Sequence, residues 1–361
     1  LSDTYLAKAY DLLNDESPDS LDEAQAQYEE AVKSEDAEDF LAELRSSMHY
    51  TLEPDMTYIS ILRDAQNNRF NREKLQAAFN RIQESDELFN GLFADVDLYS
   101  NRLGTGDQKQ SATIAEVIKV LDGADLIHAE GDVLGNAYEY LIGQFAMEAG
   151  KKAGEFYTPR QVSEVMAQIV TLSGDVTSVY DPTVGSGSLL LTVKQHLSSQ
   201  EQKNLNYYGQ EKNTATYNLT RMNLLLHGVR PEKMTIRNAD TLAQDWPEDP
   251  KRPSEAVQFD AIVMNPPYSL KKWNSDGLTI SDPRFSFVGM MPPYKTGDYA
   301  FLLHGLYHLG QKGTMAIVLP HGVLFRGAAE GIIRKKLLED GSIYAVIGMP
   351  ANLFFGTSIP T

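Results

Sequence analysis

The chain has 361 residues, more than one hydrophobic core usually holds, so we expect two domains. Hydrophobic residues make up 42% of it, an ordinary proportion for a globular protein, and no apolar run is long enough to span a bilayer. The sequence contains no cysteine, which excludes disulfides, thiolate metal sites and a cysteine nucleophile, and fits a reducing cytoplasm.

The net charge is −18, and it is concentrated near the N-terminus. Residues 1–50 hold 14 acidic and 3 basic side chains, a local charge of −11. The rest of the chain is therefore free to approach a nucleic acid locally, but without high affinity of its own. The acidity predicts a basic partner.

Residues 1–148 have the pattern of an all-helical domain. Residues 19–32 are rich in Glu, Gln and Ala, and apolar positions recur at helical spacing in residues 72–82 and 114–121. Residues 132–142 begin another predicted helix, and residues 104–107 form a predicted loop. The chain begins at Leu1 without a basic segment before an apolar stretch, so we predict no secretion signal. Both ends of the sequence have the character of fragment limits.

From about residue 155, predicted strands alternate with predicted helices, which is typical of a parallel sheet covered on both faces. The strands are predicted at residues 178–180, 205–209, 234–236, 259–264, 314–319 and 343–347, and the helices at 162–171, 189–197, 214–226, 299–309 and 329–338. Ligands of such sheets bind at the carboxyl ends of the strands. Each candidate polar residue follows a predicted strand.

The most informative segment is the apolar strand Phe259–Met264 followed by Asn265, Pro266, Pro267 and Tyr268. Two prolines cannot continue a sheet, so the strand ends in a rigid, extended tetrapeptide. This tetrapeptide offers an amide oxygen, main-chain carbonyls and an aromatic face. Such groups suit a flat ring that bears an amino group. The alternative is a Pro-Pro turn that caps a buried strand.

A glycine-containing turn, residues 181–188, follows the first strand. Its candidate binding residues are Asp181, Thr183, Gly185, Ser186, Gly187 and Ser188. Glycines allow backbone N–H groups to approach a ligand at a helix N-terminus. The spacing is neither a pyrophosphate-binding GxGxxG nor a P-loop, so a nucleoside without phosphates fits better. A plain strand-to-helix turn is the alternative.

The next two strand ends supply acidic residues. Glu211 can accept hydrogen bonds from both hydroxyls of a ribose, and Asp240 can accept from an adenine amino group. The alternatives are an exposed glutamate beside Lys212 and a helix N-cap or turn aspartate. The ordered set, with one polar residue at each strand end, is more specific than any member.

Five segments give the chain a resemblance to a known family. They are residues 132–141 (DVLGNAYEYL), 154–160 (GEFYTPR), 181–190 (DPTVGSGSLL), 297–301 (GDYAF) and 319–327 (LPHGVLFRG). With the Asn-Pro-Pro-Tyr motif, the chain resembles S-adenosylmethionine-dependent N6-adenine DNA methyltransferases. More narrowly, it resembles the modification subunit of a type I restriction–modification system.

The resemblance implies a fold and two domains. The fold class is α/β, a Rossmann-like class I S-adenosylmethionine-dependent methyltransferase sheet preceded by an all-helical N-terminal domain. The domains are residues 1–148, helical, and residues 149–361, catalytic and truncated at the C-terminal end. The family places an antiparallel seventh strand between the fifth and sixth, and it would begin where this sequence stops. We therefore expect a gap or a poorly paired sheet edge beside residues 314–319.

The resemblance also implies the site. Asn265, Pro266, Pro267 and Tyr268 would hold the target base, and S-adenosyl-L-methionine would be the cofactor. Phe354 or Phe355 could add a second aromatic wall, although core packing suits either better. We expect no metal, because His304, His308 and His321 lack convincing ligand spacing with carboxylates. The implied cofactor-binding residues are Glu155, Phe156, Tyr157, Thr158, Pro159, Arg160, Asp181, Thr183, Gly185, Ser186, Gly187, Ser188, Glu211, Asp240, Thr241 and Leu242.

The implied function is site-specific methylation of adenine N6 in double-stranded DNA by a cytoplasmic enzyme. The implied partner is a DNA specificity subunit that binds two modification subunits, with a restriction nuclease subunit left open and no membrane involved. Two alternatives remain: an N-methyltransferase that acts on a protein glutamine amide or an RNA base, and a non-catalytic cofactor-binding assembly subunit. The intact Asn-Pro-Pro-Tyr motif argues against a purely structural role.

Overall fold

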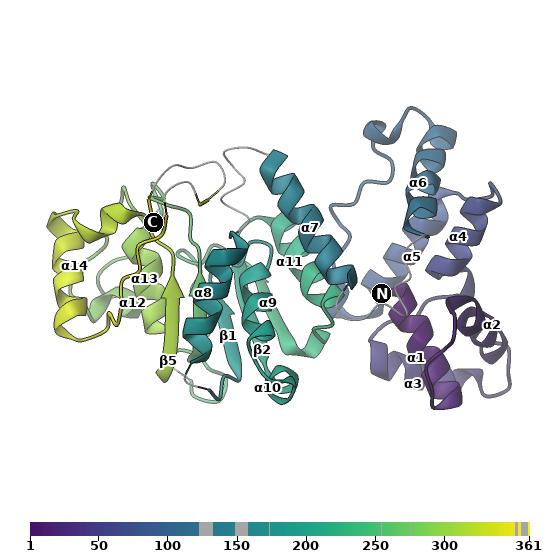
Figure 1. Cartoon of the computed structure of the whole chain (residues 1–361), viewed down its shortest axis with the longest axis horizontal. Coiled ribbons are helices and arrows are strands. Elements are labelled where there is room, and N and C mark those ends of the chain that lie inside the picture. The colour runs from purple at the N-terminus through teal and green to yellow at the C-terminus, as the bar shows by residue number, and fades with distance from the viewer. Residues whose placement is uncertain are drawn as a thin grey trace. The chain divides into compact units, whose positions relative to one another are not determined.

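The computed structural model describes residues 1–122, 133–148, 158–172, 174–253, 255–274, 276–350, 353–354 and 360–361 (Figure 1). The chain divides into two compact units, residues 1–134 and 135–361. This division lies earlier in the chain than the predicted boundary after residue 148, and the two-domain assignment with that boundary stays a prediction. No helix among the described residues is long and apolar enough to cross a membrane.

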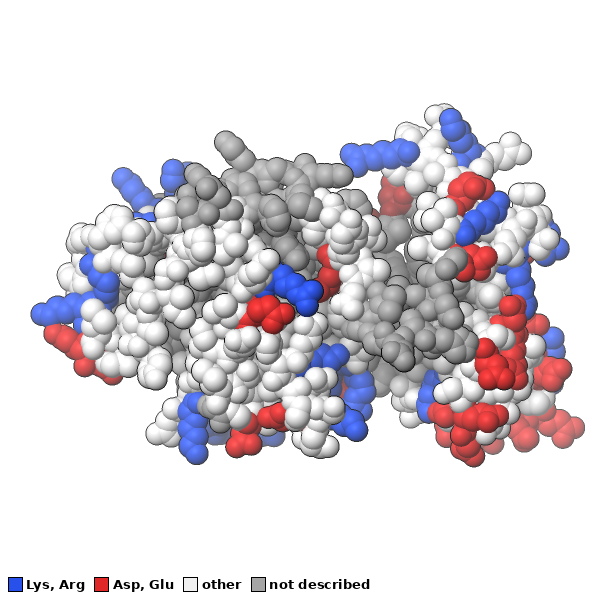
Figure 2. Space-filling model, in the orientation of Figure 1, with Lys and Arg blue, Asp and Glu red and all other residues white. Residues whose placement is uncertain are grey.

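The first unit is helical, without a strand among its described residues. Its core is aromatic: the ring of Tyr5 stacks on Tyr50 at 5.4 Å and meets Tyr28 edge-on at 5.5 Å. Figure 2 shows carboxylates gathered over this unit, as the sequence charge requires. Its helices are α1 (Ser2–Asn14), α2 (Leu21–Ala31), α3 (Ala37–Met48), α4 (Tyr58–Gln66), α5 (Arg72–Ser85) and α6 (Asp107–Leu121), with short 3-10 helices at Pro54–Met56, Glu87–Phe89 and Asn101–Leu103.

The second unit contains a parallel sheet of five strands in the order β3-β2-β1-β4-β5. The predicted α/β class is confirmed. The strands are β1 (Ser178–Asp181), β2 (Asn206–Glu211), β3 (Met234–Asn238), β4 (Phe259–Met264) and β5 (Leu309–Ile317). The helices are α7 (Val133–Glu148), which spans the division between the units, α8 (Arg160–Thr171), α9 (Ser188–Gln195), α10 (Ser199–Asn204), α11 (Thr214–Leu226), α12 (Pro283–Ser286), α13 (Asp298–Tyr307) and α14 (Ala328–Glu339), with 3-10 helices at Pro231–Lys233 and His321–Leu324.

Helices cover both faces of this sheet, which explains why its strands are apolar on both sides. On β4, Val263 belongs to one buried cluster, whereas Ile262 and Met264 belong to the other. Helices α8 and α9 pack on the first face, and α12, α13 and α14 contribute to the cluster on the second. The central strands are therefore held rigidly, and their carboxyl ends have fixed positions.

A carboxylate joins the amino ends of the two central strands. Asp260 Oδ2 on β4 accepts hydrogen bonds from the backbone N–H groups of Thr177 and Ser178, at 3.0 and 3.1 Å, and from both hydroxyls, at 2.8 and 3.1 Å. Residues that lie 83 positions apart in the sequence thus pair side by side. This contact sets the register at the start of β1.

Two strand predictions need correction. The predicted sixth strand, residues 343–347, is not a strand, and Tyr344, Val346 and Ile347 are exposed. Apolar composition alone does not make a strand, because a strand needs a hydrogen-bonded neighbour, and the described sheet ends at β5. Among the described residues β5 is the outermost strand, and the expected gap or poorly paired edge beside it stays a prediction.

The fifth strand begins at Leu309 rather than at residue 314. Its first half contains Gly310 and Gly313, which are typical of a turn in sequence. A side chain at Gly313 would place Cβ only 2.8 Å from the backbone oxygen of Phe259. Glycine therefore permits this close approach of β5 to β4, where the register is irregular.

Candidate functional site

The parallel strands bring the predicted polar residues to one edge of the sheet. Asp181 ends β1 and Glu211 ends β2, and the register pairs Asp181 with Gly209 and Glu211 with Asn238 on β3. Asn265 directly follows β4, the other neighbour of β1. Asp240 lies two residues after the end of β3, so four neighbouring strand ends supply the residues that the sequence predicted.

The glycine turn after β1 is fixed by its neighbours. Gly185 and Gly187 have φ angles of 54° and 83°, in the left-handed region that favours glycine. On α11, the hydroxyl of Thr220 donates to the Gly185 carbonyl, and Asn223 Nδ2 donates to the Ser186 carbonyl at 2.9 Å. A Cβ atom at Gly187 would lie 3.1 Å from Thr220 Cγ2. These contacts from α11 fix the conformation of the turn and hold its backbone groups in place at the start of α9.

Within this turn, Asp181 is fully buried. Its Oδ1 accepts hydrogen bonds from Thr183 N at 2.8 Å and Thr183 Oγ1 at 3.2 Å, whereas its Oδ2 has no partner among the described residues. Burial raises the pKa of this carboxyl to about 7, and the neighbouring Glu211 adds to the shift. An unpaired, buried carboxylate oxygen fits a cationic amino group.

Glu211 is partly buried, and its carboxylate forms no ion pair with the amino group of Lys212 in the described structure. Its carboxylate accepts a hydrogen bond from the Asn213 N–H at 2.7 Å. Burial raises its pKa, although backbone N–H groups of Asn213, Gly185 and Lys212 oppose the shift. The amino group of Lys212 lies 2.7 Å from Asp240 instead. The alternative of an exposed glutamate beside a lysine therefore does not describe Glu211.

Asp240 forms a turn after β3, which is the alternative that the sequence offered. Its Oδ1 accepts from the N–H groups of Leu242 and Ala243 at 3.2 and 3.4 Å, and its Oδ2 accepts from Lys212. The Thr241 hydroxyl donates to the carbonyl of Pro182, so this turn lies against the glycine turn. Lys212 is 76% exposed, so its ion pair with Asp240 is weak. The adenine role of Asp240 stays a prediction.

The Asn-Pro-Pro-Tyr segment places its amide between two hydroxyls. Asn265 Nδ2 donates to Thr158 Oγ1 at 3.2 Å, and Tyr268 Oη donates to Asn265 Oδ1 at 3.0 Å. The Tyr268 ring meets the buried Phe354 edge-on, with ring centroids 6.0 Å apart. Burial and the nearby Asp298 raise the pKa of Tyr268, so its hydroxyl stays protonated and can donate. Asn265 Oδ1 keeps a second lone pair for another donor.

Three residues of the predicted cofactor set, Glu155, Phe156 and Tyr157, lie outside the described residues, as does Phe355, the candidate for a second aromatic wall. Of the same segment, Thr158 and Pro159 are buried at the start of α8, whereas Arg160 is exposed with Nε 3.5 Å from Glu164. The contact between Thr158 and Asn265 could not be derived from the sequence, because the two residues are 107 positions apart. Phe354 belongs to the core, as expected, and also touches Tyr268.

Comparison with known proteins places these features in a family. Residues 129–361 match the N-6 DNA methylases, and residues 19–121 match the HsdM N-terminal domain. The chain belongs to the N-6 DNA methylase family. The predicted resemblance to type I modification subunits is confirmed.

Several relatives of this N-6 DNA methylase are named type I methylase subunits. The MpnII subunit of Mycoplasma pneumoniae is 38% identical over 88% of this chain and 61% of its own length. The MjaIX subunit of Methanocaldococcus jannaschii is 32% identical over 64% of this chain and 40% of its own. The chain thus spans between two fifths and about three fifths of these two relatives.

Solved structures agree with this assignment. A type I restriction-modification system methyltransferase subunit from Streptococcus thermophilus superimposes with a TM-score of 0.91 at 49% identity, covering 99% of this chain and 75% of that one. A putative class I S-adenosylmethionine-dependent methyltransferase from Listeria monocytogenes has a TM-score of 0.52 at 15% identity, with 84% of each chain covered. The second likeness concerns the fold alone, and together they confirm the predicted methyltransferase fold class.

The methylase fold also contains a histidine cluster that residue spacing in the sequence did not indicate. Asp245 Oδ1 lies 2.9 Å from His308 Nε2 and 3.4 Å from His304 Nδ1, so the histidines do have a carboxylate neighbour. The buried Arg284 guanidinium lies 3.7 Å from the same oxygen and supplies a positive charge. Burial, with His308 and Arg284 nearby, holds the pKa of His304 well below its ordinary value, so this imidazole is neutral. The expectation of no metal stays a prediction.

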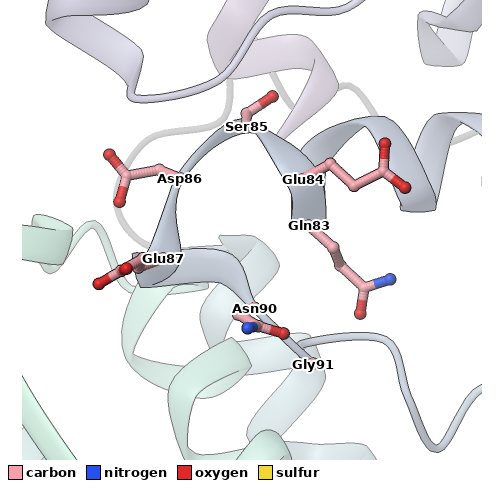
Figure 3. A pocket seen from close by; sticks show the side chains of 7 residues that line it. All are labelled: Gln83, Glu84, Ser85, Asp86, Glu87, Asn90 and Gly91. Atoms are coloured by element: carbon pink, nitrogen blue, oxygen red, sulfur yellow. The ribbon is translucent and has the colours of Figure 1, made fainter.

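A hollow of about 580 Å³ lies in the helical unit, at the end of α5 (Figure 3). It shares no residue with the strand ends of the methylase sheet. Its seven lining residues include three acidic side chains and no aromatic one, whereas sites for flat organic ligands are lined mostly by hydrophobic and aromatic side chains. This hollow therefore does not suit a purine ring. Its lining residues are Gln83, Glu84, Ser85, Asp86, Glu87, Asn90 and Gly91.

Proposed function

We propose that this chain methylates adenine N6 in DNA, with S-adenosyl-L-methionine as methyl donor, as the catalytic part of a type I modification subunit. The observation that carries the proposal is the arrangement of Asp181, Glu211 and Asn265 at neighbouring strand ends of a methylase sheet. Separate acceptors for a nucleoside cofactor and for an amino-bearing base lie on one edge of one rigid sheet.

The residues at the first two strand ends fit this cofactor. Asp181 Oδ2, buried and without a partner in the described part of the chain, suits the amino group of the methionine moiety. Glu211 suits the two ribose hydroxyls, because one of its oxygens is already oriented by the Asn213 N–H. When bound, the cofactor supplies an electrophilic sulfonium methyl group, so the protein needs no nucleophile of its own.

Asn265, Pro266 and Tyr268 act on the target base. Exocyclic N6 of adenine is a poor nucleophile, because its lone pair is delocalised into the ring. Asn265 Oδ1 and the Pro266 carbonyl accept the two amino hydrogens, which favours tetrahedral geometry and a localised lone pair at N6. Tyr268 stacks on the base. Asn265 is neutral and cannot act as a useful base, so the proton leaves after methyl transfer, to water.

An adenine within a duplex cannot reach residues at the carboxyl ends of these strands, so the base must be flipped out of the helix. Stacking on Tyr268, worth about 1–3 kcal/mol per base, offsets part of the cost of unstacking the base. The net charge of −18 disfavours tight DNA binding by this chain, which supports the proposal that a separate specificity subunit binds the DNA. The same proposal includes two modification subunits per specificity subunit and an optional nuclease subunit. It also includes a cytoplasmic location, because the chromosomal substrate lies in the cytoplasm.

The Asn265→Ala variant tests the proposal. Methyl transfer should fall by about 10²–10³, as when one preorganised transition-state contact is lost. Cofactor affinity should change little, because Asp181 and Glu211 lie on other strands. The measurement is labelled-methyl incorporation into adenine N6 by the complex reconstituted with its specificity partner. Asn206→Ala, at the opposite end of β2, is a matched control and should retain the wild-type rate.

Two outcomes would contradict the proposal. A wild-type rate in Asn265→Ala would mean that another residue performs the chemistry. Incorporation of label into a protein glutamine or an RNA base, with none in DNA, would favour the alternative N-methyltransferase.

A further inference from the structure

Two segments that carry the family resemblance, residues 297–301 and 319–327, have no role in the mechanism above. The structure brings one charged residue from each together: Arg326 Nη1 donates to Asp298 Oδ2 at 2.6 Å. Both side chains also bind Ser269, the residue directly after Tyr268. Asp298 Oδ1 accepts from the Ser269 N–H at 2.7 Å, and Arg326 Nη2 donates to Ser269 Oγ at 3.2 Å.

The backbone at Ser269 is held in an unfavourable conformation. Its φ angle is 52°, in the left-handed region that costs a residue other than glycine about 1–2 kcal/mol. Such conformations persist where surrounding contacts over-determine them, and they cluster at functional sites. Here Asp298 binds the backbone and Arg326 binds the hydroxyl. The direction in which the chain leaves Tyr268 is therefore fixed by these two residues.

The charges make Arg326 hard to replace. Asp298 is fully buried and Glu330 is 2% exposed, and both carboxylates share the guanidinium of Arg326. Although burial opposes the charge, hydrogen bonds to Asp298 and Glu330 raise the pKa of Arg326. Without that guanidinium two buried carboxylates would lose their cation, which is strongly unfavourable. A lysine cannot reproduce a planar fork with several fixed donors.

We propose that Asp298 and Arg326 are positioning residues for the target base. They fix the turn at Ser269 and so orient the Tyr268 ring, whose hydroxyl in turn binds Asn265. In the described part of the chain, neither residue forms a hydrogen bond with Asn265 or with the strand ends assigned to the cofactor. Loosening this pair should therefore impair capture of the flipped base and leave cofactor affinity intact. The inference rests on the proposed function, since it assigns a role within the same site.

The test uses the full complex, reconstituted with its specificity subunit, and a duplex that contains the methylated site mapped in the host genome. A second duplex carries 2-aminopurine at the target adenine, which becomes more fluorescent when it leaves the stack. In Arg326→Lys, we expect KM for DNA to rise at least tenfold and the 2-aminopurine signal to fall to less than half. The affinity for S-adenosylmethionine should stay within twofold of the wild type.

Arg334→Lys is the matched control. Arg334 is on α14 with Glu330, and its guanidinium donates to the carbonyls of Val323 and Arg326 but not to Ser269. This variant should keep the wild-type KM and fluorescence. Equal losses in the two variants would mean general loosening and would overturn the proposal, as would unchanged KM and fluorescence in a folded Arg326→Lys variant.

If Arg326→Lys fails to fold, Ser269→Val decides the question. A β-branched residue strongly disfavours a φ of 52°, and this substitution leaves the buried charges in place. Weaker capture of 2-aminopurine with unchanged cofactor affinity supports the inference, and a wild-type signal overturns it. The proposed function fails separately, in the wild-type complex, if no label reaches adenine N6.

Discussion

The proposed cofactor site depends on single side chains at the strand ends. Glu211 is partly buried, accepts a backbone N–H and has a pKa raised by burial. If it binds a ribose, Glu211→Ala should weaken S-adenosylmethionine binding by about 1–3 kcal/mol, the usual loss for a buried group without its partner. Isothermal titration calorimetry measures this change. Unchanged affinity would remove Glu211 from the cofactor site.

Asp181 should make cofactor binding depend on pH. Burial raises its pKa to about 7, and a cationic amino group beside it favours the ionised form. Below pH 7 the free protein must first release a proton, so affinity should fall by up to about tenfold per pH unit. In Asp181→Asn the affinity should be lower and nearly independent of pH between 6 and 8. A wild-type pH profile in that variant would contradict the assignment.

The same pKa has a consequence for stability. A carboxyl whose pKa is raised on folding is harder to ionise in the folded state than in the unfolded chain. The contribution of Asp181 to the free energy of unfolding should therefore be most favourable below its ordinary value of 3.8. It should decline as the pH rises from there to about 7. This sign is opposite to that of a salt-bridged aspartate.

At the scale of elements, the sequence predicted most of what positions the site. The ends of β1 and β4 could be predicted, because their apolar residues stop at Asp181 and Asn265, and the predicted second strand ended only two residues before Glu211. The predicted strand at 343–347 failed, because pairing depends on neighbours that local composition does not describe. The bond between Asn265 and Thr158 and the contacts at Ser269 also join distant segments, so neither spacing nor periodicity indicated them.

The close approach of β5 to β4 gives a test at this scale. Gly313→Ala would place a methyl group 2.8 Å from the carbonyl oxygen of Phe259, and backbone cannot move aside cheaply. We expect a loss of about 1–3 kcal/mol in the free energy of unfolding, as for other overpacked sites. Gly331→Ala on α14 is the control. Its nearest neighbours lie 3.8 Å away, so it should be neutral or stabilising by about 0.4–1 kcal/mol.

Chemical denaturation of both variants measures the difference. Equal stability of Gly313→Ala and Gly331→Ala would mean that the two strands separate freely at this point. The irregular register between β4 and β5 would then accommodate a side chain at residue 313 and would not require glycine there.

At the scale of the whole molecule, net charge should govern the proposed encounter with DNA. The net charge is −18, and the helical unit carries much of it (Figure 2). The purified chain should therefore bind duplex DNA weakly and without preference for sequence. Fluorescence anisotropy with duplexes that do and do not contain the mapped site measures this. Tight, sequence-selective binding by the chain alone would contradict the proposed need for a specificity partner.

The central strand β1 pairs on one side with β2, which follows soon in the sequence, and on the other with β4, where Asp260 binds Thr177 across 83 residues. A ribosome adds about 5–20 residues per second, so this second partner is made roughly 4–17 s after β1. Throughout that interval an apolar strand has one bare edge. The nascent chain is therefore exposed to misassembly with its neighbours on the same messenger RNA, and chaperones that cover strand edges should act on it before residue 260 emerges.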